Sequence, residues 1–289
     1  MRNHLLMAGL IAGLFISAAM PAQAGGYDRS TKKAIKAALA GEHRSAEHKA
    51  RDAARKPYEV LEFFGLRDDM TVVEVWPGSG WYTEILAPVL KDKGQLYAAP
   101  FSPNAPYGFA RRGLGAYLSM LGTTPDLYRN VTITYLYPPY DMQPAPRGSA
   151  DMVLTFRNVH NFYMKLFGGG RSSDMYYDAM FDALKPGGIL GVVDHRWPDP
   201  ATEDPVAANG YVSIERTVAD AEAAGFKLVD QSGMLANPRD DHEHPRGVWT
   251  LPPSYAAGDE DREAYTAIGE SDRFVLKFIK PASSPASGG

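Results

Sequence analysis

Cysteine is absent from the sequence of 289 residues. Its absence excludes disulfide bonds, thiolate chemistry and a lipid anchor on an N-terminal cysteine, so the fold must be held by its hydrophobic core. Positive charge is not in excess either, because 34 acidic residues outnumber 30 lysines and arginines and the formal net charge is −4. Proteins that bind nucleic acid present a basic field, so we expect no nucleic-acid partner.

An apolar run that approaches the length of a membrane span occurs once, from Leu5 to Met20. Arg2 precedes it, and Ala22-Gln23-Ala24 follows as a small-x-small cleavage site. This pattern predicts a secretory signal peptide over residues 1–24 and a periplasmic or secreted protein. The alternative is an uncleaved anchor, but sixteen residues are short for a span, so we expect no stable membrane anchor.

The rest of the chain divides into three parts by composition. Residues 25–56 are rich in alanine and lysine and predict a helical N-terminal arm, broken near Gly41. Residues 57–280 show no internal repeat and predict one domain. Residues 281–289 are small and polar, which favours a disordered tail. The arginines of the arm (Arg44, Arg51 and Arg55) are more typical of a solvated helix face than of a substrate pocket.

The domain alternates strand-like and helix-like segments. The expected strands are 70–76, 95–99, 131–137, 151–156, 189–193, 226–231 and 274–279, and the expected helices are 57–64, 81–90, 113–121, 175–184 and 213–224. Such alternation implies parallel pairing in a doubly wound α/β sheet. Ligands bind such sheets at the carboxyl ends of the strands, which directs attention to the segments that follow each strand.

The segment after the first expected strand has the strongest local pattern. The strand carries Glu74 near its end, and Pro77-Gly78-Ser79-Gly80-Trp81 leads into a helix. Glycines let a ligand approach the backbone, the helix start offers free N–H groups, and Glu74 could hold a cationic group. The alternative is a tight turn that needs glycine for its geometry alone.

Two further segments complete an ordered set of motifs. Phe156-Arg157-Asn158-Val159-His160-Asn161 ends the fourth expected strand, and Leu184-Lys185-Pro186-Gly187-Gly188 precedes the fifth. Together with the Glu74 to Trp81 segment, they resemble class I S-adenosylmethionine-dependent methyltransferases, and more closely a group of exported bacterial proteins predicted to be methyltransferases. The resemblance spans about residues 57–280. It implies a doubly wound, Rossmann-like sheet of seven strands with the last antiparallel.

The same resemblance implies the cofactor and its site. The cofactor would be S-adenosyl-L-methionine, with methyl transfer to a small-molecule or lipid-like acceptor. The residues that would line the cofactor are Glu74, Pro77, Gly78, Ser79, Gly80, Trp81, Arg157 and Asn158. The sequence departs from the family pattern twice. Trp76 stands where the loop usually has its first glycine and should narrow or reshape the cleft, and the second strand ends at Ala99 without the acid that usually holds the ribose.

Histidines and carboxylates also follow three of the expected strands. His160 follows the fourth, Asp194 and His195 the fifth, and the segment Asp240-Asp241-His242-Glu243-His244 the sixth. Histidine can act as a general base, so we expect His160 to take a proton from the acceptor with Asp194 or His195 assisting. The same side chains could bind a metal. The alternatives are a hydrogen-bonded structural histidine at 160 and a solvated charged loop at 240–244.

Three functions therefore remain open from the sequence. The first is methyl transfer from S-adenosylmethionine to a small molecule. The second is a non-catalytic ligand-binding protein that keeps the methyltransferase fold outside the cytoplasm, where no supply of the cofactor is evident. The third is a metal-dependent protein that uses His160, His195 and the 240–244 segment.

Overall fold

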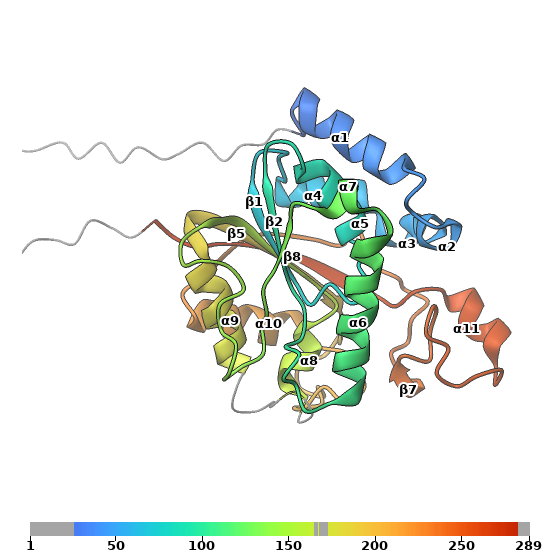
Figure 1. The fold of residues 1–289 in the computed structure, drawn as a ribbon. Coiled ribbons are helices and arrows are strands. Elements are labelled where there is room, and N and C mark those ends of the chain that lie inside the picture. The colour runs from blue at the N-terminus through green and yellow to red at the C-terminus, as the bar shows by residue number, and fades with distance from the viewer. Residues whose placement is uncertain (1–25, 165–166, 168–172, 283–289) are drawn as a thin grey trace, which may run out of the picture.

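The computed structural model describes residues 26–164, 167 and 173–282 (Figure 1). The expected signal peptide, residues 1–24, and the tail from residue 283 lie outside these ranges. Within the described part of the chain, no helix is both long and apolar enough to cross a lipid bilayer.

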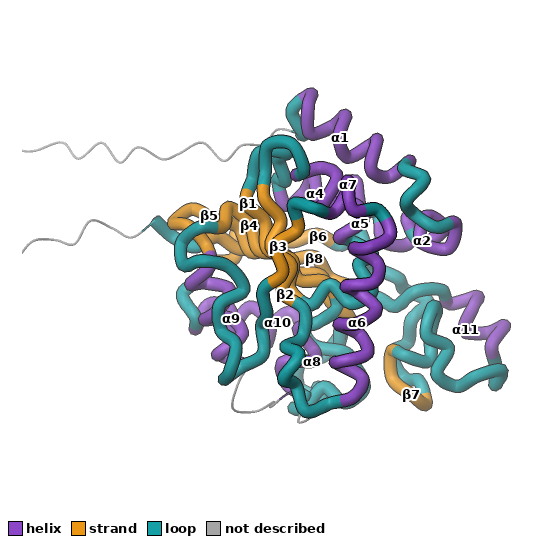
Figure 2. The backbone as a smooth tube through the Cα atoms, in the orientation of Figure 1, coloured by secondary structure: helices purple, strands orange, loops and turns teal. Residues whose placement is uncertain are grey.

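Helices and strands alternate through the domain as expected (Figure 2). The helices are α1 (Arg29–Ala40), α2 (Ala46–Ala50), α3 (Asp52–Arg55), α4 (Pro57–Phe64), α5 (Thr83–Leu90), α6 (Gly108–Thr123), α7 (Pro125–Tyr128), α8 (Val159–Tyr163), α9 (Ser173–Ala183), α10 (Ile214–Ala223) and α11 (Arg262–Ile268). The strands are β1 (Thr71–Val75), β2 (Gln95–Ala99), β3 (Val131–Ile133), β4 (Ala150–Phe156), β5 (Leu184–His195), β6 (Lys227–Ser232), β7 (Pro245–Val248) and β8 (Arg273–Ile279).

Seven of these strands form one sheet in the order β3-β2-β1-β4-β5-β8-β6. Strands β1 to β5 pair in parallel, and β8 runs antiparallel to both β5 and β6. The expectation of a seven-stranded sheet with an antiparallel last strand is confirmed. The register places Val75 of β1 opposite Ala99 of β2 and Thr155 of β4, so these three strands end side by side.

Local sequence explains where several helices begin and end. Gly41 terminates α1, and Gly65 adopts the left-handed conformation that ends α4 after Pro57 has opened it. Ser213 caps α10 by accepting a hydrogen bond from the backbone N–H of Arg216. Boundaries differ elsewhere: β3 is shorter than expected, α6 and β5 are longer, and β7 and α11 were not predicted.

Two layers of helices cover the sheet (Figure 1). Apolar side chains of α1, α4 and α5, such as Ile35, Leu61 and Ile85, form one core on one face. Side chains of α8 and α9, such as Phe162 and Tyr176, form the second core on the other face. The ends of β1, β4 and β5 lie between these two cores, so the segments that follow them meet at one edge of the sheet.

Candidate active site

The loop between β1 and α5 contains two glycines, of which one is accessible to a ligand and the other is covered by a side chain of α6. Gly78 is exposed with a φ of 61°, and a Cβ built on it would have no atom within 4 Å. Gly80 has a φ of 91°, but a Cβ there would lie 2.1 Å from the terminal methyl group of Met120 in α6. The exposed Ser79 lies between them. A ligand could therefore approach the backbone closely at Gly78, while α6 shields Gly80.

Glu74 of β1 is buried, with 2% of its surface exposed. Its Oε2 accepts a hydrogen bond of 2.6 Å from the Thr83 hydroxyl, which itself lies 3.2 Å from the Tyr117 hydroxyl. Burial raises the pKa of Glu74 to about 7, and the bond from Thr83 offsets part of this rise. A carboxylate held in this way favours a cationic partner, because a positive charge would compensate for the water it has lost.

Trp76 adopts a backbone conformation that is more usual for glycine. Its φ is 47°, a left-handed value that is rare for a bulky residue. The indole is buried, donates a 2.8 Å hydrogen bond to the carbonyl of Leu136 and lies 4.3 Å from the ring of Phe101. The indole thus fills the space beyond the ends of β1 and β2 as part of the second core. Ala99 is also fully buried, and its carbonyl accepts a bond from the Trp76 N–H.

Arg157 and Asn158 follow β4 and have different environments. Arg157 has a φ of 61°, and its N–H donates a 2.6 Å bond to the carbonyl of Val193 in β5. The side-chain amide of Asn158 donates to the carbonyls of Val75, at 3.0 Å, and Trp76, at 3.4 Å. Asn158 therefore ties the end of β1 to the end of β4 and fixes the glycine loop relative to the residues that follow β4.

Pro77 and Trp81 complete the loop. The carbonyl of Pro77 accepts a 2.9 Å bond from Gly80, which closes the turn. The indole of Trp81 is buried and donates a 3.1 Å bond to the carbonyl of His48 in the N-terminal arm. Trp81 therefore anchors the arm to the loop, a role that the sequence did not suggest.

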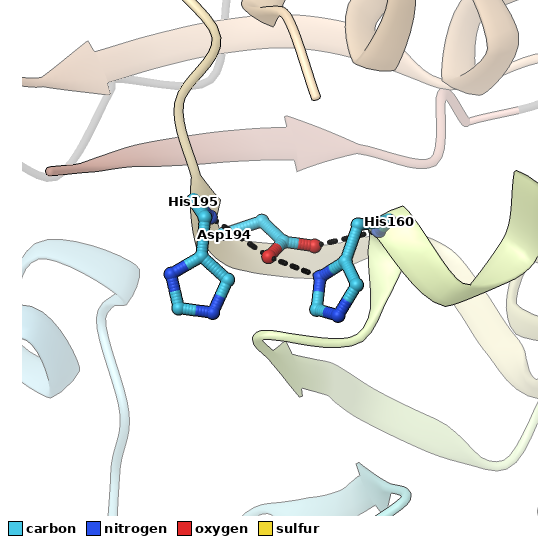
Figure 3. A group of neighbouring side chains, drawn as sticks. All are labelled: His160, Asp194 and His195. Carbon is cyan, nitrogen blue, oxygen red and sulfur yellow. Dashed lines mark hydrogen bonds and ion pairs between the residues drawn. The ribbon is translucent and has the colours of Figure 1, made fainter. Parts of the chain in front are cut away.

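His160, Asp194 and His195 converge as the topology predicted (Figure 3). Asp194 is fully buried, and its Oδ1 lies 2.8 Å from His160 Nδ1. Backbone N–H groups of His160 and His195 donate to the same carboxylate at 2.9 Å and 2.7 Å. Both imidazole rings turn to the same side in Figure 3, with their centroids 5.3 Å apart.

The hydrogen bonds assign the roles of the two rings. A carboxylate only accepts, so His160 donates its Nδ1 proton to Asp194, and Nε2 is the ring nitrogen that does not bind this carboxylate. Burial lowers the pKa of His195 well below its usual value, and the charges of His160, Arg157, Arg273 and Arg55 lower it further. His195 is therefore neutral, and its Nδ1 lies 2.5 Å from the Ser271 hydroxyl.

The 240–244 loop forms a separate cluster. Asp240 is buried and accepts hydrogen bonds from the Tyr211 hydroxyl, from His244 Nε2 at 2.8 Å, and from the N–H groups of His242 and Asp272. The ring of Tyr211 lies between His195 and His242, with centroids 6.1 Å and 5.4 Å away. Donors therefore already satisfy the carboxylate, and this loop does not join the His160 cluster.

Asp240 and His242 also line a hollow of about 370 Å³ beside Arg196 and Asp272. Among the described residues, two groups have ligand atoms close enough to hold an ion. They are His160 with Asp194 and His195, and Asp240 with Asp241 and His244. In both groups the buried aspartate is already engaged by N–H or O–H donors.

The arginines of the N-terminal arm do not form a solvated face. Arg44 and Arg55 are each 2% exposed, so that expectation was wrong for both. The Arg55 guanidinium lies 4.4 Å from the centre of the Trp81 ring and pairs with Glu270, which lies far along the chain. The apolar partner and the acid are both distant in sequence, so composition of the arm alone could not reveal this burial.

Comparison with known proteins rests on structure alone, since no protein-family model and no curated protein matches the sequence. A SAM-dependent methyltransferase from Aquifex aeolicus is 15% identical, with a TM-score of 0.52, over 80% of this chain and 93% of that chain. The cyclase SpnF is 16% identical, with a TM-score of 0.54, over 89% and 99%. Phosphoethanolamine N-methyltransferase 2 of Haemonchus contortus, in complex with S-adenosyl-L-methionine, is 14% identical, with a TM-score of 0.52, over 86% and 60%.

These similarities establish the fold. The chain has the α/β fold of class I S-adenosylmethionine-dependent methyltransferases, with the strand order and antiparallel β8 described above. One of the three structures is named for cyclisation and not for methyl transfer. Function must therefore be argued from the site.

Proposed function

We propose that the protein transfers a methyl group from S-adenosyl-L-methionine to a small-molecule acceptor outside the cytoplasm. The observation that carries this proposal is a histidine oriented by a buried carboxylate directly after the strand end that is tied to the glycine loop. Asn158 makes that tie to Val75, and His160 follows it by two residues. The sequence pattern of residues 1–24 supports the compartment.

The residues around the loop fit the proposed cofactor. Gly78 and Ser79 are exposed, and the methionine end of the cofactor would occupy the open space above Gly78. Glu74 would compensate a cationic group in that region. Such residues also fit the cofactors named in the similar structures. When bound, the sulfonium group of S-adenosylmethionine supplies an electrophilic methyl group.

The protein's part in the reaction is positioning and proton removal. His160 Nε2 would accept the proton of an acceptor hydroxyl or amine as that atom attacks. Asp194 would stabilise the imidazolium that forms, because its Oδ1 already accepts from Nδ1. Neutral His195 would add no competing positive charge. General-base catalysis of this kind contributes about 10²- to 10⁴-fold to a rate.

Transfer of labelled methyl groups tests this proposal. The protein would be incubated with S-adenosylmethionine labelled in the methyl group and with a fraction of small molecules from cells. We expect label to appear in one class of small molecule, and His160→Gln to reduce the rate by about 10²-fold or more. His244→Gln is the matched control, because its partner Asp240 belongs to the separate loop. Equal loss in both variants would contradict the role of His160.

A second function is favoured by the ends of β1 and β2. The Trp76 indole and Phe101 fill the space beyond these strands, and Ala99 offers no carboxylate for a ribose. These residues suit a ligand-binding protein that holds another molecule without transfer. Native mass spectrometry of protein taken from its own compartment separates the two functions. Bound S-adenosylhomocysteine supports transfer, and a different bound molecule supports the second function.

A further inference from the structure

Four arginines surround a single acidic side chain beside the His160 cluster. Arg51 Nε lies 2.6 Å from Glu270 Oε1, whereas Arg55 Nε and Arg273 Nη1 lie 3.4 Å and 3.1 Å from Glu270 Oε2. Arg157, at the end of β4, is the fourth arginine, and burial lowers its pKa more than the charge of Glu270 raises it. Among the described residues, Glu270 therefore pairs with three of the four arginines.

The pKa of Glu270 is lowered by the positive charges around it. Burial alone would raise the pKa of Glu270, but Arg273, Arg55 and Arg51 outweigh burial and lower it to about 2. Burial and the neighbouring Arg157 lower the pKa of Arg55 well below its usual value. Both directions agree with the contacts, in which several arginines share one acidic side chain among the residues that the structure describes.

Several donors of the cluster have no acceptor. Arg55 is 2% exposed, and its buried nitrogens include one without a hydrogen-bond partner among the described residues. The same holds for Nη2 of Arg51 and for Nε of Arg157. A buried donor without a partner destabilises the folded protein, and more so when the donor is charged. Three such donors around one acid are therefore costly unless an anion completes the set.

The cluster adjoins the proposed catalytic residues. Arg273 of β8 is the strand partner of His195 in β5, and the N–H of Arg157 donates to the carbonyl of Val193 in β5, two residues before His195. Arg55 lies 4.4 Å from the centre of the ring of Trp81, close to the start of α5. An anion bound among the arginines would thus lie between the start of α5 and the end of β5, where an acceptor would have to sit to reach His160.

We propose that Arg51, Arg55, Arg157 and Arg273 bind an anionic group, a carboxylate or a phosphate, on the acceptor. The assignment of this anion to a methyl acceptor rests on the proposed function. The existence of an anion-binding site among the arginines does not. Guanidinium groups suit such anions because their N–H groups form paired, charge-assisted hydrogen bonds. The acceptor would therefore be an acidic small molecule whose reactive hydroxyl or amine is held near His160.

Calorimetric titration with inorganic phosphate tests the anion site directly. We expect saturable binding that weakens with rising salt, and a loss of at least about 10-fold in affinity in Arg157→Gln. Glu270→Gln should change affinity in the opposite direction and bind phosphate more tightly, since it removes the competing acid. Arg147→Gln is the matched control, because Arg147 is exposed and pairs with Asp182 elsewhere. No binding by the unaltered protein, or equal affinity in all variants, would overturn the proposal.

Two ligands distinguish the acceptor from the cofactor as the source of the anion. S-adenosylhomocysteine has a carboxylate, and methylthioadenosine is its analogue without the amino-acid end. We expect Arg157→Gln to leave the affinity ratio of these two ligands unchanged. A selective loss of S-adenosylhomocysteine affinity would assign the arginines to the cofactor and overturn the acceptor assignment. Failure to bind either nucleoside would contradict the proposed function while leaving the phosphate result intact.

A conservative variant keeps the test valid if Arg157→Gln does not fold. Arg157→Lys retains the charge but loses the planar set of N–H donors. We expect it to fold and to bind phosphate with intermediate affinity. Phosphate binding by Arg157→Lys that equals that of the unaltered protein would overturn the role of Arg157.

Discussion

Replacing Glu74 by glutamine should stabilise the protein in alkaline solution and leave its stability unchanged in acid. Glutamine has nearly the same shape, and its Oε1 can still accept the hydrogen bond from Thr83. The substitution therefore removes only the unfavourable free energy of burying an ionised carboxylate. The pKa of Glu74 is raised from 4.5 to about 7. A shift of this size corresponds to about 3 kcal/mol at 1.36 kcal/mol per unit.

The sign follows from where the proton resides. Below pH 4.5 the carboxyl is protonated in both the folded and the unfolded chain, so it costs nothing. Between pH 4.5 and about 7 only the unfolded chain ionises, and the stability of the folded state falls as pH rises. Above about pH 7 both states are ionised and the full cost remains. Glu74→Gln should therefore gain about 3 kcal/mol at pH 8 and close to nothing at pH 4.

Urea unfolding between pH 4 and pH 8 measures this difference. Glu263→Gln is the matched control, since Glu263 lies exposed in α11. A pH-independent difference between Glu74→Gln and the unaltered protein would refute the reasoning, as would destabilisation at pH 8. The predicted gain also shows why the acid is informative: a carboxylate that lowers stability is explained by a charged partner that the folded protein binds.

Three further predictions follow from contacts of the site. Trp76→Gly should destabilise the protein by about 2–3 kcal/mol in urea, because the lost burial of the indole exceeds the relief of its left-handed backbone; greater stability would contradict this. Asn158→Leu should cost about 1–3 kcal/mol, because the carbonyl of Val75 loses its donor; an unchanged midpoint would argue against the tie. Treatment with EDTA should leave the thermal midpoint unchanged, since donors already satisfy Asp194 and Asp240; a lowered midpoint would support a metal.

The succession of strands along the chain could be predicted because each strand has a local pattern, whereas the antiparallel last strand was implied by the resemblance to methyltransferases. The valine-rich run before Glu74 and the glycines after it set β1, its loop and α5. Parallel pairing places the carboxyl ends of the strands at one edge of the sheet, and the observed pairing of β4 with β5 brings His160 to Asp194. The convergence of these residues follows from topology and needs no knowledge of side-chain packing.

The arginine cluster could not be predicted from the sequence. Arg51 and Glu270 are 219 positions apart, and their contact depends on how the arm packs beside the start of β8. No local pattern marks such a pairing. The orientation of the Trp76 indole could not be predicted from the sequence either, because it depends on contacts with the ring of Phe101 and the carbonyl of Leu136.

Titration of the purified protein with S-adenosylhomocysteine, alone and after Gly78→Arg, tests the central claim most directly. The account predicts saturable binding by the unaltered protein and a large loss in Gly78→Arg, because the arginine side chain would occupy the open space above that glycine. Gly148→Arg is the matched control, since Gly148 also has a positive φ and open space but lies before β4, away from the site. No binding by the unaltered protein, or equal binding by Gly78→Arg, would contradict the account.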